Sequence, residues 1–585
     1  MELFVLVPVL LAFLFCLIFR DKRIRSTGYV SVIASLASLA MVIYMALFLQ
    51  QGTQSIDWFS VGGYVFSLQV TSAHINMMLL FLVALISPLI MIYSLGFFED
   101  VSEHRRFYAE MNLFAASMML FSISANFLSM IIAWEGLGIT SYLLIGFWYA
   151  KSEAARAARE SISIIIIGDV AMLAALIILF NAYGTTSFYS ISAQPISYPL
   201  YAAFLLVVLA VLTKSAQFPF SGWLPKAMEG PTPVSAFLHS STMVKAGVFL
   251  LILFIPVLLK LGLLPVILLL GAITAGIGVL NALSGKHIKR ILAYSTLEDL
   301  GLMLVAVGLN AVFAAILLFV TQTFYKALLF LDAGSISRAN GEEYDITKLR
   351  ESGGNRLIFI TAVIGVLSIA GIFPFSGFLG KVGLEVSANS IYTYIFLVLV
   401  EIGTGFYIFR WLFIPMKNSG RMEIKGKLKS TPVSMILPQV LLALFVIGGI
   451  SVYFFLPSYL GIKSLSLSYL RVIAETIFAI AGTLVAYYIY RRGHTVKVSK
   501  GLFVFVHSID GINWFYLKFA AFIEAISKFL GFLDYFVYML FYLFGFLSLW
   551  VGKRLRNLVN GNVNMYAAWI AIGFALILLA LVFRI

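Results

Sequence analysis

The hydrophobic residues of this chain occur in long, nearly uncharged runs that short polar segments separate. We count about sixteen runs of roughly 17–26 residues, each long enough to cross about 30 Å of hydrocarbon at about 1.5 Å per residue. Runs of this length predict membrane-spanning helices rather than strands. We therefore expect an all-α polytopic membrane protein. The approximate limits are 2–19, 28–50, 73–97, 109–124, 126–149, 160–183, 198–226, 233–256, 264–284, 290–309, 311–336, 356–386, 390–415, 431–457, 468–490 and 563–583.

The loops between these runs differ in charge according to the side on which alternate threading places them. Loops expected outside hold little more than Asp57, Lys260 and Lys463, whereas the cytoplasmic loops are rich in Lys and Arg. This separation follows the positive-inside rule and predicts a multi-pass protein of the cell membrane with both termini on the outer side. The charged cytoplasmic loops are expected at Arg20 to Arg25, Lys151 to Arg159, Lys286 to Arg290, Arg338 to Arg356, Lys417 to Lys429 and Arg491 to Lys500.

The first apolar run, Glu2 to Phe19, has no basic residue before it and a basic cluster directly after it. A cleavable signal peptide has the opposite order of positive charge and apolar core. We therefore expect this run to be the first membrane-spanning helix, with its N-terminus outside.

The composition excludes several classes of function. Hydrophobic residues make up 62% and charged residues 11% of the chain. Because soluble proteins have about 45–50% and about 25%, we exclude a soluble globular protein, a disordered chain and a nucleic-acid-binding protein. Cys16 is the one cysteine, so a four-cysteine zinc site or an iron–sulfur cluster cannot form within the chain. No nucleotide-binding or hydrolase motif is present either. We expect no metal and no redox cofactor in this chain.

One short motif occurs twice. Residues 218–226 read FPFSGWLPK, and residues 373–381 read FPFSGFLGK. Proline and glycine inside a membrane break helices, and the freed backbone groups are tolerated where the break is buried or lines a water-filled cavity. A pair of interrupted helices predicts a transporter built from two inverted repeats, with its sites at the breaks. The alternative is a local kink used twice for packing.

Several ionisable residues lie inside the apolar runs. Such a charge costs about 2.5–3.5 kcal/mol at the bilayer centre, so it usually faces the inside of a bundle and marks an ion or proton path. Burial disfavours the charged form and an opposite charge restores it, so a Glu–Lys pair that forms and separates can load and release a proton. The alternative for each residue is a structural ion pair. The candidates are Glu135, Asp169, Lys214, His239, Lys326 and Lys381, followed by Lys245, Asp332 and Glu401.

Two further acids, Glu298 and Asp299, are expected nearer a helix end, at a solvated turn. Residues 501–556 mix aromatic residues with spaced charges, which predicts a long amphipathic helix along the membrane surface. The alternative is one more span through the uncharged stretch from Tyr535 to Gly552. That span would place the basic residues 553–556 outside, so we favour the lateral helix.

At four stretches the sequence resembles the antiporter-like subunits of respiratory complex I. Residues 131–148 are similar to the glutamate helix of that family, and residues 214–236, 288–296 and 324–331 are close to its other signatures. The resemblance covers essentially the whole chain. The length and the C-terminal region are similar to the L-type subunit, which implies a lateral helix at 501–556 before a last transmembrane anchor.

The resemblance also implies roles for the candidate residues. In the order of the proton path, these are Glu135, Asp169 and Lys214 in the first half-channel, His239 as the link to the centre, Lys326 as the central lysine, Lys381 as the terminal lysine of the second half-channel, and Lys289 as a further lysine with a weaker claim.

The function that the resemblance implies is proton translocation in a complex I-like NADH–quinone oxidoreductase, or one with another donor, whose redox chemistry lies in other subunits. The expected partners are the other membrane subunits, of the M, N, K and J types, and the lipid bilayer, with no nucleic acid. The alternatives are a subunit of an Mrp-type sodium/proton antiporter or of a membrane-bound hydrogenase, and a purely structural clamp.

The sequence departs from this family in a few places. Gln322 stands four residues before the central lysine, where the family often has histidine, and Lys226 replaces a usual aspartate. The stretch 297–301, LEDLG, replaces a more neutral one, and Asp332 is an unexpected acid. We expect six regions: N-terminal helices at 1–108, a first antiporter-like repeat at 109–256, a second at 264–415, C-terminal helices at 431–500, the lateral helix at 501–556 and the anchor at 557–585.

Overall fold

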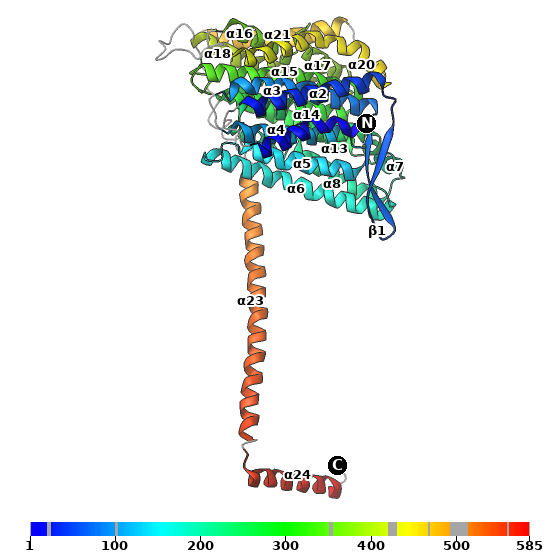
Figure 1. Cartoon of the computed structure of the whole chain (residues 1–585), viewed down its shortest axis with the longest axis vertical. Coiled ribbons are helices and arrows are strands. Elements are labelled where there is room, and N and C mark those ends of the chain that lie inside the picture. Colours follow the sequence, from blue (N-terminus) through cyan, green and yellow to red (C-terminus); the bar gives the residue numbers. More distant parts are fainter. Residues whose placement is uncertain are drawn as a thin grey trace. The chain divides into compact units, whose positions relative to one another are not determined.

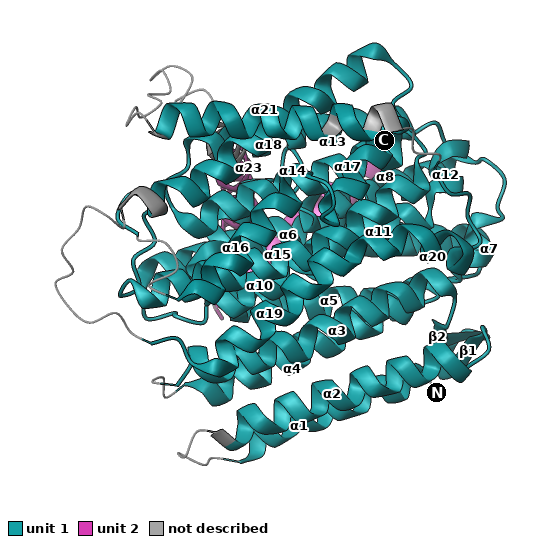
Figure 2. Ribbon diagram, turned by 90° about the horizontal axis from the view of Figure 1, so that it is seen from above, with its two compact units in different colours: residues 1–511 teal, residues 512–585 magenta. Residues whose placement is uncertain are grey.

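The computed structural model describes residues 2–19, 25–99, 103–349, 355–418, 430–465, 469–491, 513–558 and 561–583. It divides into two compact units, Met1–Gly511 and Ile512–Ile585, which Figure 2 colours separately. Most of the basic loops predicted at 20–25, 417–429 and 491–500 lie outside the described residues, as do residues 501–512 of the predicted lateral helix.

Unit 1 is a bundle of helices that pack side by side (Figure 1). Short turns connect most neighbouring helices, as the apolar runs predict. The helices are η1 (Glu2–Leu6), α1 (Val7–Ile18), α2 (Arg25–Phe48), α3 (His74–Phe97), α4 (His104–Ile123), α5 (Phe127–Ile145), α6 (Ser152–Tyr183), α7 (Phe188–Ser192), α8 (Tyr198–Lys214), α9 (Trp223–Lys226), η2 (Ala227–Glu229), α10 (Thr232–Ser240), α11 (Met243–Leu253), α12 (Ile255–Lys260), α13 (Leu264–Ser284), α14 (Ile288–Gly308), α15 (Val312–Ala339), α16 (Arg356–Ile369), α17 (Gly377–Val386), α18 (Ile391–Asn418), α19 (Val433–Gly448), η4 (Gly449–Ser451), α20 (Val452–Leu460) and α21 (Tyr469–Arg491).

The fold class is confirmed: the chain is an all-α polytopic membrane protein. Among the described residues, 13 helices are long and apolar enough to cross a membrane, and three shorter apolar helices accompany them. The predicted total of sixteen spans is not confirmed, because the set of 13 includes Ala521–Arg556, which was not counted as a span, and omits α4.

The two copies of the repeated motif interrupt helices, as predicted. The first break separates α8 from α9 at residues 215–222, and the second separates α16 from α17 at residues 370–376. In each break the peptide bond between phenylalanine and proline is cis, at Phe218–Pro219 and Phe373–Pro374.

A third interruption was not predicted. The run at 233–256 was expected to form one helix, but α10 ends at Ser240 and α11 begins at Met243. The Thr242 hydroxyl donates a hydrogen bond of 2.6 Å to the carbonyl oxygen of Phe237, and the Thr323 hydroxyl donates one of 3.3 Å to that of Ser240. Side-chain hydroxyls therefore satisfy carbonyl groups that the interruption frees.

A β-hairpin was also missed. Strand β1 (Thr53–Val61) pairs antiparallel with β2 (Tyr64–Thr71) within a segment expected to be a loop. Gly62 and Gly63, with φ of +60° and +83°, form the two-residue turn that such hairpins favour. Phe66 of β2 packs on Phe180 of α6 at 5.0 Å between ring centroids, which fixes the hairpin to the bundle.

The centre of unit 1 consists of helices that are almost completely enclosed by their neighbours, namely α10, α11, α14 and α15. Helices α13 and α14 form the most extensive helix pair. A Cβ atom on Gly278 would lie 2.5 Å from the backbone nitrogen of Glu298, and one on Gly301 would lie 2.5 Å from that of Ala275. These glycines allow the two backbones to touch, as small residues do between membrane helices.

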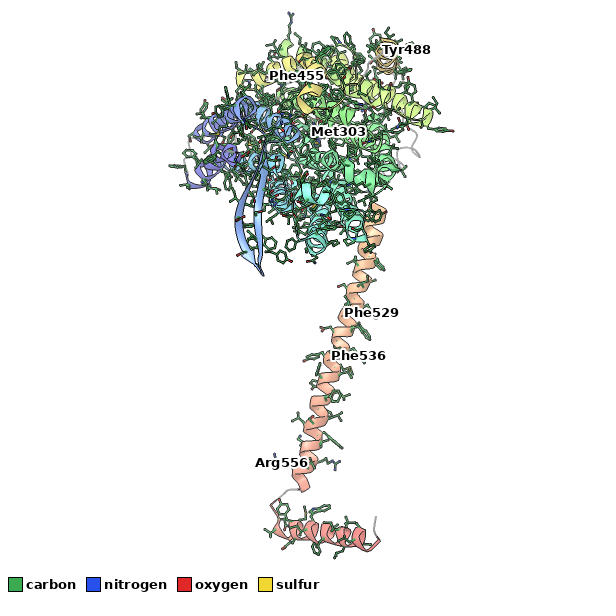
Figure 3. The ribbon with its side chains drawn as sticks, turned by 90° about the vertical axis from the view of Figure 1, so that its right-hand side faces the viewer. Met303, Phe455, Tyr488, Phe529, Phe536 and Arg556 are labelled. Carbon is green, nitrogen blue, oxygen red and sulfur yellow. The ribbon has the colours of Figure 1, made fainter. Side chains whose placement is uncertain are left out.

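Unit 2 contains α23 (Asn513–Leu558) and α24 (Val563–Phe583). Figure 3 shows the aromatic side chains of Phe529 and Phe536 projecting from α23. Helix α23 has 46 residues; at about 1.5 Å per residue it is about 69 Å long. That exceeds twice the hydrocarbon thickness of about 30 Å. The prediction of one long helix in this region is confirmed from residue 513 onward.

Candidate functional site

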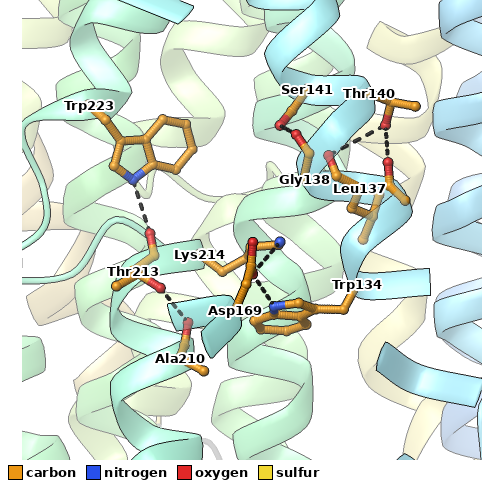
Figure 4. Close-up of polar contacts among 11 residues, drawn as sticks. Trp134, Leu137, Gly138, Thr140, Ser141, Asp169, Ala210, Thr213, Lys214 and Trp223 are labelled. Atoms are coloured by element: carbon orange, nitrogen blue, oxygen red, sulfur yellow. Dashed lines mark hydrogen bonds and ion pairs between the residues drawn. The ribbon is translucent and has the colours of Figure 1, made fainter. Parts of the chain in front are cut away.

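A buried ion pair lies directly before the first helix break. The Nζ atom of Lys214, the last residue of α8, is 3.1 Å from Oδ1 of Asp169 on α6. The indole nitrogen of Trp134, on α5, donates a hydrogen bond of 2.8 Å to the same oxygen (Figure 4). Lys214 also lies 4.9 Å above the centre of the Trp134 ring. Trp134 therefore contacts both members of the pair, by a hydrogen bond and by a cation–π interaction.

Glycine backbones give this pair its space. A Cβ atom on Gly138 would lie 3.1 Å from Nζ of Lys214 and 3.5 Å from Oδ2 of Asp169. A Cβ atom on Gly168 would overlap Oγ1 of Thr213, at 1.8 Å. The side chains of Lys214 and Asp169 are 0% and 8% exposed. The pair is thus enclosed, and its partners have almost no water to compete with them.

Glu135 lies next to this pair but is not part of it. Its charge acts on Lys214 and Asp169, and yet it forms no ion pair within the part of the chain that the structure describes. The side chain is only partly buried. The direct partner of Lys214 is therefore the aspartate Asp169, whereas the sequence analysis considers a Glu–Lys pair.

His239 lies at the end of α10, beside the unpredicted break. Its ring stacks on Phe330 of α15 at 4.7 Å between centroids, and neither ring nitrogen has a hydrogen-bond partner among the described residues. The side chain of Gln322 donates a hydrogen bond of 3.2 Å to the carbonyl oxygen of His239. The residue is completely buried. The ring nitrogens thus make no hydrogen bond to the described residues, while Gln322 holds the backbone of His239.

Lys245, on α11, is held by neutral oxygens. Its Nζ donates hydrogen bonds of 2.5 Å to the carbonyl oxygen of Phe319 and of 2.6 Å to the hydroxyl of Thr323. It lies 4.5 Å from the centre of the Phe319 ring. These contacts attach α11 to α15, so Lys245 has a packing role in this arrangement.

A second buried ion pair occupies the centre of the bundle. The Nζ atom of Lys326 on α15 is 3.0 Å from Oδ2 of Asp299 on α14, and both side chains are at most 1% exposed. Lys326 also donates a hydrogen bond of 2.5 Å to the hydroxyl of Ser295. The expectation that Glu298 and Asp299 lie at a solvated turn is wrong, because both are buried in the middle of α14.

Lys381 and two carboxylates line a small cavity beyond the second break. Lys381 and Glu385 belong to α17 and Glu401 to α18, and the cavity of about 10 Å³ has the size that one water molecule needs. The Nζ atom of Lys381 has no hydrogen-bond partner among the described residues. Gly371 (φ +76°) lies so close that a Cβ atom would be 2.7 Å from Oε1 of Glu401.

Two other candidates have local partners. Nζ of Lys289, at the start of α14, donates a hydrogen bond of 2.8 Å to the carbonyl oxygen of Gly230. Oδ1 of Asp332 accepts a hydrogen bond of 2.9 Å from the hydroxyl of Thr361, and the residue is fully buried. Lys226, which follows the first break, pairs with Glu160 at a partly exposed position.

Sequence reasoning missed the residues that hold the acids in place. Trp134 was visible within the glutamate-helix motif, and its indole could have been recognised as a buried donor that needs an acceptor. Thr404 and Tyr407 of α18 donate hydrogen bonds to Glu298, the latter at 2.7 Å. No pattern in α18 alone predicts those bonds, because they depend on which helix packs against it.

Chemically, the arrangement gathers titratable side chains in the buried interior of unit 1. Among the described residues, no group of three or more His, Cys, Asp or Glu side chains is placed to ligate an ion. A lysine–carboxylate pair in a low dielectric is neutral overall whether the proton sits on the nitrogen or on the oxygen. Such a pair changes its protonation readily when the two groups separate.

Comparison with known proteins identifies the family. Residues 124–406 match the family described as "NADH:quinone oxidoreductase/Mrp antiporter, TM". The chain is 33% identical over 504 residues to NADH-quinone oxidoreductase subunit L of Campylobacter jejuni, which is 82% of this chain and 82% of that relative. It is 35% identical over 431 residues to NAD(P)H-quinone oxidoreductase chain 5 of Synechocystis sp., with 68% and 63% covered.

A solved structure supports the fold. A chain in the structure of the Mrp complex from Dietzia sp. DQ12-45-1b aligns with a TM-score of 0.72 at 21% identity. The alignment covers 99% of this chain, which spans 62% of the length of that chain. From these relationships, the chain belongs to the family of antiporter-like membrane subunits that includes subunit L of NADH-quinone oxidoreductase.

Proposed function

We propose that this chain is the proton-translocating membrane subunit of a complex I-like quinone oxidoreductase. The observation that carries the proposal is the set of three enclosed lysines, Lys214, Lys326 and Lys381, each beside carboxylates in the interior of unit 1. Intramembrane charges of this kind face bundle interiors and mark ion paths. The names of the relatives favour NADH or NAD(P)H as the electron donor of the parent complex.

The proposed path begins at the first half-channel and ends at the second. Glu135 exchanges a proton with the Asp169–Lys214 pair, and a change in that pair releases the proton toward His239. From there it passes to Lys326 at the centre and to Lys381 at the end, with Lys289 as an auxiliary group. Electron transfer takes place in other subunits, and this chain works without a redox cofactor or metal of its own.

The proposed setting is the plasma membrane of a prokaryote, with both termini on the outer side. The partners are other membrane subunits of the same complex, of the M, N, K and J types. Helix α23, at about 69 Å, is too long for a single span of about 30 Å. It carries Glu524 and Lys528 as an ion pair one turn apart, 2.7 Å between charged atoms. We therefore place it along the membrane surface, where it contacts the neighbouring subunits.

The test is proton pumping in inverted membrane vesicles that contain the whole complex, comparing wild type with Glu135→Gln at low and high sodium. We expect pumping to fall by at least about tenfold in the variant, because a fixed amide cannot take up a proton. Pumping that persists in the variant would overturn the path from Glu135.

The second candidate is a subunit of an Mrp-type sodium/proton antiporter, which the shared fold with a chain of an Mrp complex favours. Transport that follows sodium in the same vesicles would support this candidate. A membrane-bound hydrogenase as the parent complex is tested by the donor: pumping driven by hydrogen and not by NADH would assign the chain to it.

A further inference from the structure

Glu298 of α14 stands one residue before Asp299, the acid of the central ion pair. It is completely buried, as is Asp299, which pairs with Lys326 at 3.0 Å. Leu302, one helical turn after Glu298, lines the cavity beside Lys381, and the charge of Lys381 acts on Glu298. The two adjacent acids of α14 therefore lie in the field of two lysines, one on α15 and one on α17.

The carboxylate of Glu298 is held in place from α18. Tyr407 donates a hydrogen bond of 2.7 Å to Oε2, and Thr404 donates one to Oε1. Both donors bond to the acid through hydroxyls, which can rotate and accept as well as donate. This arrangement fixes where the carboxyl points while leaving both of its protonation states hydrogen-bonded.

The titratable groups around Lys326 belong to both halves of the proposed path. Besides Asp299, the charges of Glu298 and Lys381 act on Lys326, and the charge of Lys326 acts on Lys245 and His239. On the other side, position 322 of α15 holds a glutamine, which hydrogen-bonds to the backbone of His239 and cannot titrate. Toward Lys381, Glu298 is the acid of α14 that interacts electrostatically with both lysines.

We propose that Glu298 carries the proton from the Lys326–Asp299 pair to Lys381. The inference rests on the proposed function and extends its path by one named residue. In the step, an N–H bond of Lys326 breaks and an O–H bond forms on Glu298. That O–H bond then breaks as an N–H bond forms on Lys381. One proton moves, the charge follows it, and no electron is transferred.

The close contact of α13 and α14 supports a fixed position for this acid. A Cβ atom on Gly278 would lie 2.5 Å from the backbone nitrogen of Glu298, so the backbone here has no freedom to move toward α13. With α18 on another side, Glu298 is positioned by packing as well as by hydrogen bonds. Such support from neighbouring elements is what a proton-transfer group needs to keep its geometry.

The experiment compares Glu298→Gln with Asp332→Asn in the whole complex in inverted vesicles. Both variants replace a fully buried acid by its amide, but among the described residues Asp332 hydrogen-bonds to the neutral hydroxyl of Thr361. We expect Glu298→Gln to lower proton pumping by at least about tenfold and Asp332→Asn to keep most of it. Equal pumping in Glu298→Gln and wild type would overturn the inference.

Glu298 could also act as a fixed negative charge beside the lysines, without binding the proton itself. Infrared difference spectroscopy during turnover distinguishes this role from proton transfer through the carboxyl. A carboxyl that binds and releases the proton gives a carbonyl band that is absent in Glu298→Gln and present in Asp332→Asn. A band unchanged in Glu298→Gln would overturn the inference even if pumping falls. If Glu298→Gln does not assemble, Tyr407→Phe keeps the acid and removes one hydrogen bond, and we expect the same band to shift; an unshifted band overturns the inference.

Failure of this inference is separable from failure of the proposed function. If Glu135→Gln and Lys214→Met stop pumping while Glu298→Gln does not, the function stands and Glu298 is not on the path. If none of the three variants affects pumping, the proposed function itself is rejected.

Discussion

The two interrupted helices carry nearly the same motif but place their buried lysine on opposite sides of the break. In the first, Lys214 precedes the break and pairs with Asp169 at 3.1 Å. In the second, Lys381 follows the break and lines a small cavity with Glu385 and Glu401. The motif aligns Lys381 with Lys226, and Lys226 instead pairs with Glu160 where both side chains are about one-third exposed.

The difference shows that two helix breaks with nearly the same sequence can surround their lysine with different partners. The first lysine is enclosed by a partner, an indole ring and glycine backbones, so its charge is compensated in place. The second has space beside it and no hydrogen bond to its nitrogen among the described residues. One half of the bundle therefore holds its lysine in a closed ion pair, and the other leaves its lysine beside a small cavity.

The largest effect is expected when the two lysines on either side of the first break, Lys214 and Lys226, are replaced one at a time by methionine. We expect Lys214→Met to abolish proton pumping without preventing assembly, because methionine keeps the length of the side chain but removes the amino group that carries the proton. Lys226→Met, at the position aligned with Lys381, should retain more than about half of the activity, since partly exposed ion pairs contribute little. Pumping by quinone-reducing inverted vesicles measures both. Equal effects would contradict the assignment of Lys214.

The next largest effect tests the indole hydrogen bond within the closed pair. Trp134→Phe keeps a ring over Lys214 but removes the donor to Asp169, and hydrogen bonds to charged groups contribute about 1.5–3 kcal/mol. We expect pumping to fall about tenfold. The matched control is Trp223→Phe, whose indole donates at 3.0 Å to the neutral carbonyl oxygen of Thr213. A larger loss in Trp223→Phe than in Trp134→Phe would disprove the charge-assisted role.

Substitution of Gly371 tests the cavity that Lys381 and Glu401 line beyond the second break. Gly371→Ala adds a Cβ atom 2.7 Å from Oε1 of Glu401 and 3.0 Å from Cδ of Lys381, at a φ of +76°. Gly461→Ala has a similar φ of +65° and no atom within 4 Å, so it measures the backbone strain alone. We expect pumping to fall several-fold in Gly371→Ala and little in Gly461→Ala. If both fall equally, the cavity geometry is not what matters.

The smallest effect concerns a loop outside the membrane segments. Burial, with repulsion from Lys289 and Arg290, lowers the pKa of His287 to about 3. The ring stacks on Tyr344 at 5.0 Å, and the amide of Ile288 bonds to the carbonyl oxygen of Tyr344 at 2.8 Å. The unfolded histidine takes a proton below about pH 6.5, whereas the folded one does not. The contact between the start of α14 and the segment around Tyr344 should therefore weaken as pH falls from 6.5 toward 3. The loss of stability is up to about 1.4 kcal/mol per pH unit.

Amide hydrogen exchange of Ile288, corrected for the intrinsic rate, measures this effect at pH 7 and pH 5. His287→Phe keeps the stacked ring and removes the titrating group, so its protection should not depend on pH in this range. Protection in wild type that is constant, or that rises on acidification, would show that His287 does not control the loop.

The sequence was sufficient for the helices and for the buried lysines. A run of apolar residues long enough to span the membrane leaves little choice of element, and Lys214 and Lys326 stand out because such runs rarely tolerate a charge. The partner of Lys214 was not predictable, since Glu135 and Asp169 are both acids on neighbouring helices. The choice between them depends on the glycine backbones that bring α5, α6 and α8 together.

Two other features could not be predicted from the sequence, for physical reasons. The segment around Glu298 combines Ser, Thr, two acids and Gly, which locally favours a turn, and only the packing of α13 and α18 makes it a buried helix. The break after Ser240 has no proline or glycine to mark it, because hydroxyl groups of neighbouring residues satisfy the backbone. By contrast, the Gly62–Gly63 pair was a readable hairpin signal in the segment between α2 and α3.

The glycine contact between α13 and α14 has a consequence for how the protein is made. Alone, α14 would bring two adjacent carboxylic acids into lipid, at a cost of about 2.5–3.5 kcal/mol for each charged side chain near the bilayer centre. Gly278 and Gly301 let its backbone lie directly against α13, and a connection of three residues, 285–287, joins the two helices. We therefore expect the translocon to release α13 and α14 into the bilayer together, as one helical hairpin, during biogenesis.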